Sequence, residues 1–131
     1  MSALSAILRR IQDGRIAWWC PGCGGPHAIP VEGAGAWTWN GKVDAPTFRP
    51  SVLTTGFELT RAGEALLLKD QADGTSRGDG FTYPRVATVC HSFVTDGKMQ
   101  FLADCTHALA GQTVAISPWP STYHDGDRDD A

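Results

Sequence analysis

Residues 18–27, WWCPGCGGPH, hold two cysteines separated by proline and glycine. Thiolates at this spacing can bind one metal ion, and the Pro-Gly pair favours the tight turn between them. A thioredoxin-like dithiol would need a helix after its second cysteine, but glycines and a proline follow here. A zinc deaminase would need H-x-E upstream, and none precedes Cys20. The run therefore predicts a zinc knuckle that ties the start of the chain to a distant segment.

A knuckle supplies two ligands, and the chain has four cysteines. In a reducing cytoplasm four cysteines indicate metal binding rather than disulfides. The other ligands must then come from Cys90, Cys105 or a histidine. Residues 86–94 and 99–103 are two β-like runs on either side of Asp96-Gly97, a dipeptide typical of two-residue hairpin turns.

The length of this turn decides which residues share a face of the hairpin. A two-residue turn places Cys90 and Cys105 on one face, with His91 and Asp104 as diagonal neighbours on the other. A three-residue loop would bring His91 to the cysteine face in place of Cys90. The first alternative suits Asp96-Gly97 better. The predicted zinc ligands are Cys20, Cys23, Cys90 and Cys105.

Three histidines lie close in sequence to these cysteines, and two roles are open to them. They can hydrogen-bond the thiolates and fix their rotamers. Histidine beside a carboxylate is also the usual equipment for acid–base catalysis. A catalytic zinc with an open ligand position is less favoured, because the sequence lacks an H-E-x-x-H helix. The catalytic candidates are His91, His107, Asp104 and His27.

The rest of the pattern predicts a small, mostly β (α+β) protein. Leucines and isoleucines between residues 4 and 11 recur at helical spacing, which predicts an amphipathic helix over residues 1–14. That helix would dock on the body, with a homodimer contact as the alternative. Residues 15–120 show short β-like runs and turn signals, which predict one antiparallel zinc-binding domain. Residues 70–85 are expected to be a polar loop.

Charge and hydropathy exclude several classes of protein. The last eleven residues, 121–131, hold four aspartates and one arginine, which predicts a disordered acidic tail. The remaining chain balances ten acidic against ten basic residues, so it lacks the basic field that nucleic-acid binding needs. No apolar run is long enough to span a membrane, and no signal peptide is evident, so a cytoplasmic location is expected.

Four motifs in order, spanning roughly residues 16–118, resemble a family of small phage and prophage proteins. They are CPGCGGPHAIP, WTWNG, APTFRPSVL and CHSFVTDGKMQFLADCTHALAGQTV. Some members lie in bacterial operons beside multiubiquitin and activating-enzyme-like proteins, and many bear the name "ammonia monooxygenase". The resemblance implies a phage or mobile-element setting, a metal-binding core and a role in handling ubiquitin-like conjugates.

Two functions follow as hypotheses. The favoured one is a protein-interaction module of a phage accessory protein, with a structural zinc and a host or phage protein as partner. The alternative is a small zinc-dependent hydrolase, a peptidase or isopeptidase, that uses His91, His107 and Asp104. Convergence of these polar groups on a solvent-open site would favour the hydrolase, and burial against the cysteine sulfurs would favour the module.

Overall fold

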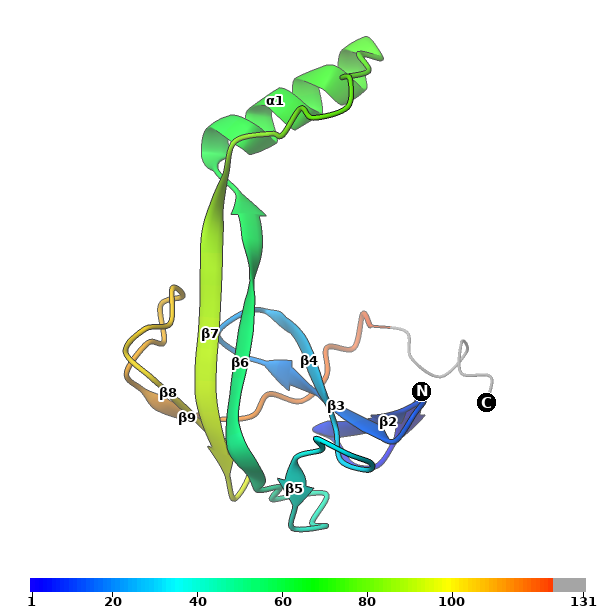
Figure 1. Ribbon diagram of the computed structural model, residues 1–131, viewed down its shortest axis with the longest axis vertical. Coiled ribbons are helices and arrows are strands. Elements are labelled where there is room, and N and C mark those ends of the chain that lie inside the picture. The colour runs from blue at the N-terminus through cyan, green and yellow to red at the C-terminus, as the bar shows by residue number, and fades with distance from the viewer. Residues whose placement is uncertain (124–131) are drawn as a thin grey trace.

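The computed structural model describes residues 1–123, which form two antiparallel sheets and one helix (Figure 1). The strands of the first sheet are, in order, β1 (Ser2–Ala3), β2 (Leu8–Ile11), β3 (Arg15–Cys20) and β4 (Gly25–Pro30). Those of the second are β5 (Thr38–Trp39), β6 (Phe48–Leu59), β7 (Arg85–Thr95), β8 (Lys98–Phe101) and β9 (Thr113–Ala115). The prediction of a mostly β, antiparallel protein is confirmed.

The prediction of an N-terminal helix over residues 1–14 is wrong, because this segment forms β1 and β2. Two features of the sequence oppose a helix. The Ser5 Oγ accepts hydrogen bonds from the backbone of Ile7 and Leu8, which offers the backbone a turn instead. Asp13 and Gly14 both adopt positive φ, which turns β2 back onto β3. The expected homodimer contact through that helix therefore loses its basis.

The helix of the described chain is α1 (Arg61–Asp73). It was not predicted from the sequence, and its last four residues fall in the segment 70–85 that was expected to be a loop. Thr60 caps its start by accepting from the Gly63 N–H at 3.0 Å. Gly74 ends it in the left-handed conformation. Residues 55–88, called the arm here, carry α1 away from the body on the outer parts of β6 and β7 (Figure 1).

The β7–β8 hairpin has the predicted two-residue turn. Asp96 and Gly97 have φ values of 51° and 78°, and Thr95 pairs with Lys98. The strand β8 ends at Phe101, so the ladder stops before the cysteine that follows it. The turn was thus predicted correctly, but the second strand is shorter than expected.

The core lies where the two sheets meet. Trp18 of β3 and Phe48 of β6 are fully buried, and their rings stack at 5.2 Å. Leu8, Met99 and Phe101 are also buried in this cluster. Apolar burial of this kind is the main favourable term in folding, so the core fixes β6 and β7 relative to β3.

The chain beyond the last strand packs back onto the body. The Tyr123 ring lies 5.6 Å from that of Trp19 and 5.0 Å from that of Trp119. The rest of the predicted acidic tail, residues 124–131, lies outside the described residues. Among the described residues, no helix combines the length and apolar character needed to cross a membrane.

Candidate active site and metal centre

Four potential metal ligands come together from three separate parts of the chain. Cys20 ends β3, Cys23 lies in the turn to β4, Cys90 lies on β7, and His107 follows β8. One ligand atom from each lies within 4.8 Å of all the others. The predicted link between the knuckle and the later hairpin therefore exists in the structure, and we call these four residues the metal group.

The geometry of the metal group suits a tetrahedral zinc ion. The Cys20 and Cys90 sulfurs are 3.9 Å apart, close to the ~3.8 Å that tetrahedral bonds of about 2.3 Å imply. The His107 Nε2 is buried and has no hydrogen-bond partner among residues 1–123. Gly22 lies against the same ring, and a Cβ there would overlap it. Three thiolates and one imidazole form a donor set that zinc favours.

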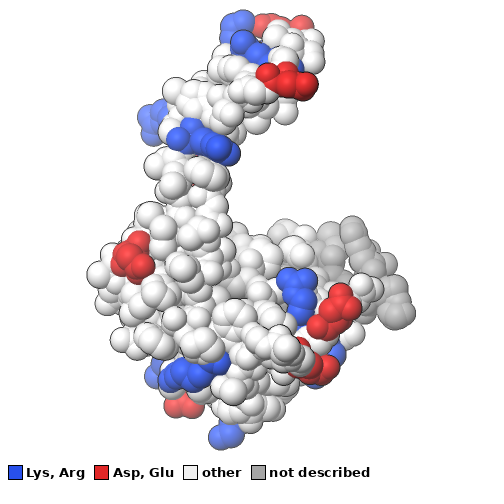
Figure 2. Space-filling model, viewed as in Figure 1, with Lys and Arg blue, Asp and Glu red and all other residues white. Residues whose placement is uncertain are grey.

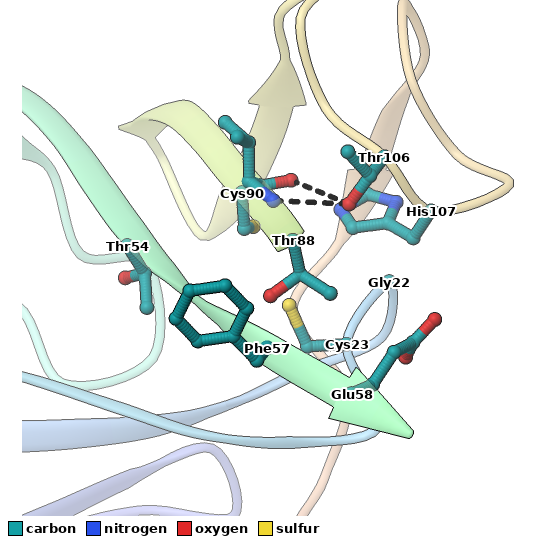
Figure 3. Close-up of a pocket in the computed structure, with 10 residues that line it drawn as sticks. Gly22, Cys23, Thr54, Phe57, Glu58, Thr88, Cys90, Thr106 and His107 are labelled. Atoms are coloured by element: carbon teal, nitrogen blue, oxygen red, sulfur yellow. Dashed lines mark hydrogen bonds between the residues drawn. The ribbon is translucent and has the colours of Figure 1, made fainter. Parts of the chain in front are cut away.

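The cysteines of the metal group influence one another's protonation. A hydrogen bond from Cys90 lowers the pKa of Cys20 to about 4 and raises the pKa of Cys90. Desolvation raises the pKa of Cys23 to about 11. The residue as a whole is exposed, but its sulfur lies within the metal group and beside the residues drawn in Figure 3. The low pKa of Cys20 favours its thiolate, the form in which cysteine binds a metal cation.

Cys105, the fourth predicted ligand, lies outside the metal group. Its Sγ accepts from the His91 N–H and donates to the His91 carbonyl oxygen, both at 3.2 Å. The hairpin register predicted otherwise because the chain turns away after Phe101, where the Cys105 N–H bonds to the Leu102 carbonyl oxygen. That turn brings His107 to the three other sulfurs instead.

Ser51, His91 and Asp104 form a second constellation of polar residues. The Ser51 Oγ lies 3.1 Å from the His91 Nε2. The His91 Nδ1 lies 3.1 Å from the Asp104 Oδ2. The His91 and Asp104 side chains are 26% and 55% exposed, so the constellation is open to solvent. This is the hydrogen-bond pattern of a Ser-His-Asp catalytic triad.

The triad lies on the opposite face of β7 from Cys90, because side chains alternate along a strand. The two-residue turn predicted this face for His91 and Asp104 and made them diagonal neighbours. Along the chain, serine comes first and aspartate last. That order differs from those of the chymotrypsin-like, subtilisin-like and α/β-hydrolase triads, so the arrangement is identified by its geometry alone.

A β-bulge aims Ser51 at His91. Phe48 pairs with Val94 and Val52 with Ser92, which leaves residues 49–51 opposite a single residue of β7. Bulges of this kind re-aim side chains beside active sites. Ser51 was not among the predicted site residues, because nothing in the APTFRPSVL motif that contains it gives this serine a histidine partner.

Two side chains hold the bulge in place. The Arg49 guanidinium donates to the carbonyl oxygens of Phe48 and Val94 at 2.8 and 2.9 Å. The Trp37 indole N–H donates to the Ser51 carbonyl oxygen at 3.2 Å. These bonds hold the backbone around the serine, from which its hydroxyl reaches His91.

His27, the remaining catalytic candidate, belongs to neither constellation. It is buried, and its Nδ1 lies 3.3 Å from the Thr54 Oγ1. Its ring meets that of Trp18 edge-on at 5.9 Å. The nearness of His27 contributes, after the hydrogen bond of Cys90, to the low pKa of Cys20. His27 therefore supports the metal group from outside it.

A hollow of about 180 Å³ adjoins the metal group. Thr54 and Phe57 of β6, Thr88 of β7, Cys23 and His107 are among the residues that line it (Figure 3). Thr54 faces Cys90 in the β6–β7 ladder, so the hollow lies on the metal side of these strands and the triad on the other.

Comparison with known proteins gives one family. Residues 3–102 match the family described as bacterial ubiquitination-like system serine protease (BubE). This chain belongs to the BubE family. The matched segment contains Ser51 and His91 and ends two residues before Asp104. The family description agrees with the expected association with bacterial ubiquitin-like genes. No match was found among curated proteins or among solved structures.

Proposed function

We propose that this BubE chain is a serine protease that hydrolyses the peptide or isopeptide bond after the C-terminal residue of a ubiquitin-like protein. The observation that carries this proposal is the Ser51–His91–Asp104 chain, with both hydrogen bonds at 3.1 Å. The family description supports the chemistry and the ubiquitin-like context. The exposure of His91 and Asp104 supports a protein-sized substrate.

In the first half of the reaction, the Ser51 oxygen attacks the carbonyl carbon of the scissile bond. His91 Nε2 takes the hydroxyl proton, and Asp104 holds the imidazole in the tautomer that leaves Nε2 free to accept it. The tetrahedral adduct then collapses and expels the amine. His91 delivers the same proton to that amine, which leaves an acyl ester on Ser51.

In the second half, water attacks the ester carbonyl while His91 takes one of its protons. Collapse of the second adduct breaks the bond to Ser51, and His91 returns the proton to the serine oxygen. The products are the free ubiquitin-like carboxylate and a free amine, and the enzyme regains its starting state.

Zinc is the proposed occupant of the metal group, where it would supply four bonds that link the β3–β4 knuckle to β7. Four protein ligands form a closed set typical of structural zinc. The proposal therefore revises the zinc-hydrolase hypothesis. It assigns His107 to metal binding rather than to catalysis and makes Ser51 the nucleophile. It keeps the zinc structural, as in the interaction-module hypothesis.

The protein partner is, on this proposal, the ubiquitin-like substrate. The phage or mobile-element setting, which the motif resemblance supports, stays part of the proposal, as does the expected cytoplasmic location. A conjugate-cleaving enzyme would be expected beside the genes that make the conjugates.

A fusion substrate tests the proposal. One domain of a bacterial multiubiquitin protein, fused through its C-terminus to a fluorescent protein, should be cut at the junction by the unaltered enzyme. Ser51→Ala should lower the rate by about 10³-fold or more. Ser76→Ala, at an exposed serine of the arm, is the matched control. Equal rates for the Ser51→Ala variant and the unaltered enzyme would refute the proposed nucleophile.

A further inference from the structure

We propose that the free edge of β6 binds the extended tail of the substrate as an added strand, which leads its scissile bond to Ser51. This inference rests on the proposed protease function. Among residues 1–123, β5 pairs with β6 only at Phe48 and Arg49. From Val52 to Leu59 the strand pairs with β7 alone, so its other edge has no strand partner in the described chain (Figure 1).

The direction of the backbone groups on this edge follows from β7. In an antiparallel pair, the N–H and C=O groups of two facing residues either point at each other or both point away. The His91 N–H bonds to Cys105, and its carbonyl oxygen accepts from the Leu102 N–H, so both groups point away from β6. Leu53, which faces His91, must therefore point its own N–H and C=O away from β7.

The next position in the ladder repeats the pattern. The Val89 carbonyl oxygen accepts from the Thr106 N–H on the far side of β7. Thr55, which faces Val89, therefore also directs its N–H and C=O to the free edge. Within residues 1–123, the backbone groups of Leu53 and Thr55 have no hydrogen-bond partner. The N–H and C=O groups of Leu53 and Thr55 are thus available to a partner strand, and they are spaced two residues apart, as in an extended chain.

Along residues 53–57, LTTGF, the edge lacks charged residues and proline, two features by which proteins protect exposed strands. All five are exposed, and the Leu53 and Phe57 side chains are 57% and 59% exposed. The Arg85 guanidinium lies 3.8 Å from the centre of the Phe57 ring. Other charged side chains lie at the far end of the arm and on the body (Figure 2). An unprotected edge of this kind suits a strand from a partner.

The catalytic site identifies the occupant. The free edge begins two residues after Ser51, and an added strand would lie about 4.8 Å from β6. In an isopeptide-linked conjugate, the leaving group is a lysine side chain, which has no main chain to pair with a strand. The main chain must then come from the acyl side. The occupant is therefore an extended C-terminal tail, with apolar or small side chains beside Leu53.

Inactivation rates with two serine-directed probes test this inference. Both probes carry the same glycine-derived diphenyl phosphonate, one as acetyl-Gly and the other as acetyl-Leu-Ser-Leu-Gly. The unaltered enzyme should react at least about tenfold faster with the longer probe, because it gains main-chain hydrogen bonds. Thr55→Pro removes one open N–H without removing a β6–β7 bond. It should lose this preference and keep its rate with the short probe.

Two controls make the test specific. Thr55→Ala keeps the N–H and should keep the preference. On the unaltered enzyme, N-methylation of the longer probe should slow inactivation at alternate amides only, a readout that does not depend on the folding of any variant.

Three results would overturn the inference. They are an unaltered enzyme without preference for the longer probe, a Thr55→Pro variant that retains the preference, and an unaltered dimer that Thr55→Pro converts to monomer in light scattering. The last would assign the edge to a second copy of the chain. A failure of both probes to label Ser51 would instead refute the proposed protease function, and this inference with it.

Discussion

Cys90 and His91 are consecutive residues of β7 whose side chains serve opposite faces of the same strand. Cys90 belongs to the metal group, and His91 bonds to Ser51 and Asp104. One peptide bond therefore joins a ligand of the proposed structural zinc, Cys90, to the proposed general base, His91. A change that moves the strand at Cys90 should also move the imidazole, so we expect metal binding to affect the proposed catalysis through the backbone.

Substitution of single cysteines separates the ligand set predicted from the sequence from the metal group found in the structure. Cys23→Ser should lose bound zinc and lower the melting temperature by on the order of 10 °C or more, because zinc binding contributes folding free energy. Cys105→Ser should keep one zinc per chain, because Cys105 bonds to His91 rather than to the metal group. Elemental analysis of the purified variants decides. Zinc loss in Cys105→Ser, with retention in His107→Ala, would contradict the assigned set.

Asp104→Asn tests the orientation of the general base. An amide at this position can favour the wrong tautomer of His91 and cannot stabilise the imidazolium, so turnover should fall about 10²-fold or more. The zinc content and the melting temperature should not change, since Asp104 is half exposed. Cleavage of the fusion substrate provides the rate, and Asp79→Asn on the exposed arm is the control. An unchanged rate would remove Asp104 from the triad.

Trp37→Phe tests whether the bulge is held by the indole N–H. The variant removes the 3.2 Å bond to the Ser51 carbonyl oxygen and retains most of the ring. We expect kcat to fall up to about tenfold with little change in KM, since one hydrogen bond is worth about 0.5–1.5 kcal/mol. Trp39→Phe is the matched control, because the Trp39 indole bonds to Lys42 instead. An equal loss in both variants would indicate a general packing effect.

Asp70 gives the arm a dependence on pH. Hydrogen bonds from Arg77, and then from Tyr83, lower the pKa of this buried carboxyl from its ordinary value of 3.8. The lower folded-state pKa stabilises the fold above about pH 3.8, and this stabilisation is lost as the pH falls through the folded-state value.

Amide signals of α1 and the following loop, followed by NMR from about pH 7 to about pH 2, measure the effect. They should broaden or shift at the acid end in the unaltered protein. Asp70→Asn should show weaker signals already at neutral pH and a flatter dependence. Identical titrations of both proteins would show that the Asp70 carboxylate does not hold the arm.

The sequence predicted those parts of the site that depend on local pattern. Asp96-Gly97 indicated the turn, and strand alternation then placed Cys90 and His91 on opposite faces of β7. Asp104 was also predicted beside His91, but it lies in the turn after β8 rather than on the predicted strand. Cys105 could not be placed correctly, because the end of β8 is set by a turn after Phe101 that carries no strong signal. The serine could not be recognised, because only the bulge in β6 gives it a histidine partner.

The N-terminal strands show how a periodic pattern can mislead. The apolar residues of this segment recur at helical spacing, but the segment is extended. In the strand, Leu8 pairs with Trp18 and is buried in the core. Tertiary pairing with β3 then outweighs local helix preference. The helix at residues 61–73 was missed because its sequence has no apolar stripe at helical spacing. Its leucines are consecutive, and in the structure Leu66 and Leu67 are only partly buried and Leu68 is exposed.

Covalent labelling of Ser51 tests the central claim most directly. The intact protein, incubated with phenylmethylsulfonyl fluoride, should gain a single adduct by mass spectrometry, and peptide mapping should place it on Ser51. His91→Ala should slow this labelling strongly, while Ser76→Ala should not. An adduct at another residue, or no adduct in protein that holds its zinc, would contradict the assignment of Ser51, His91 and Asp104 as a catalytic triad.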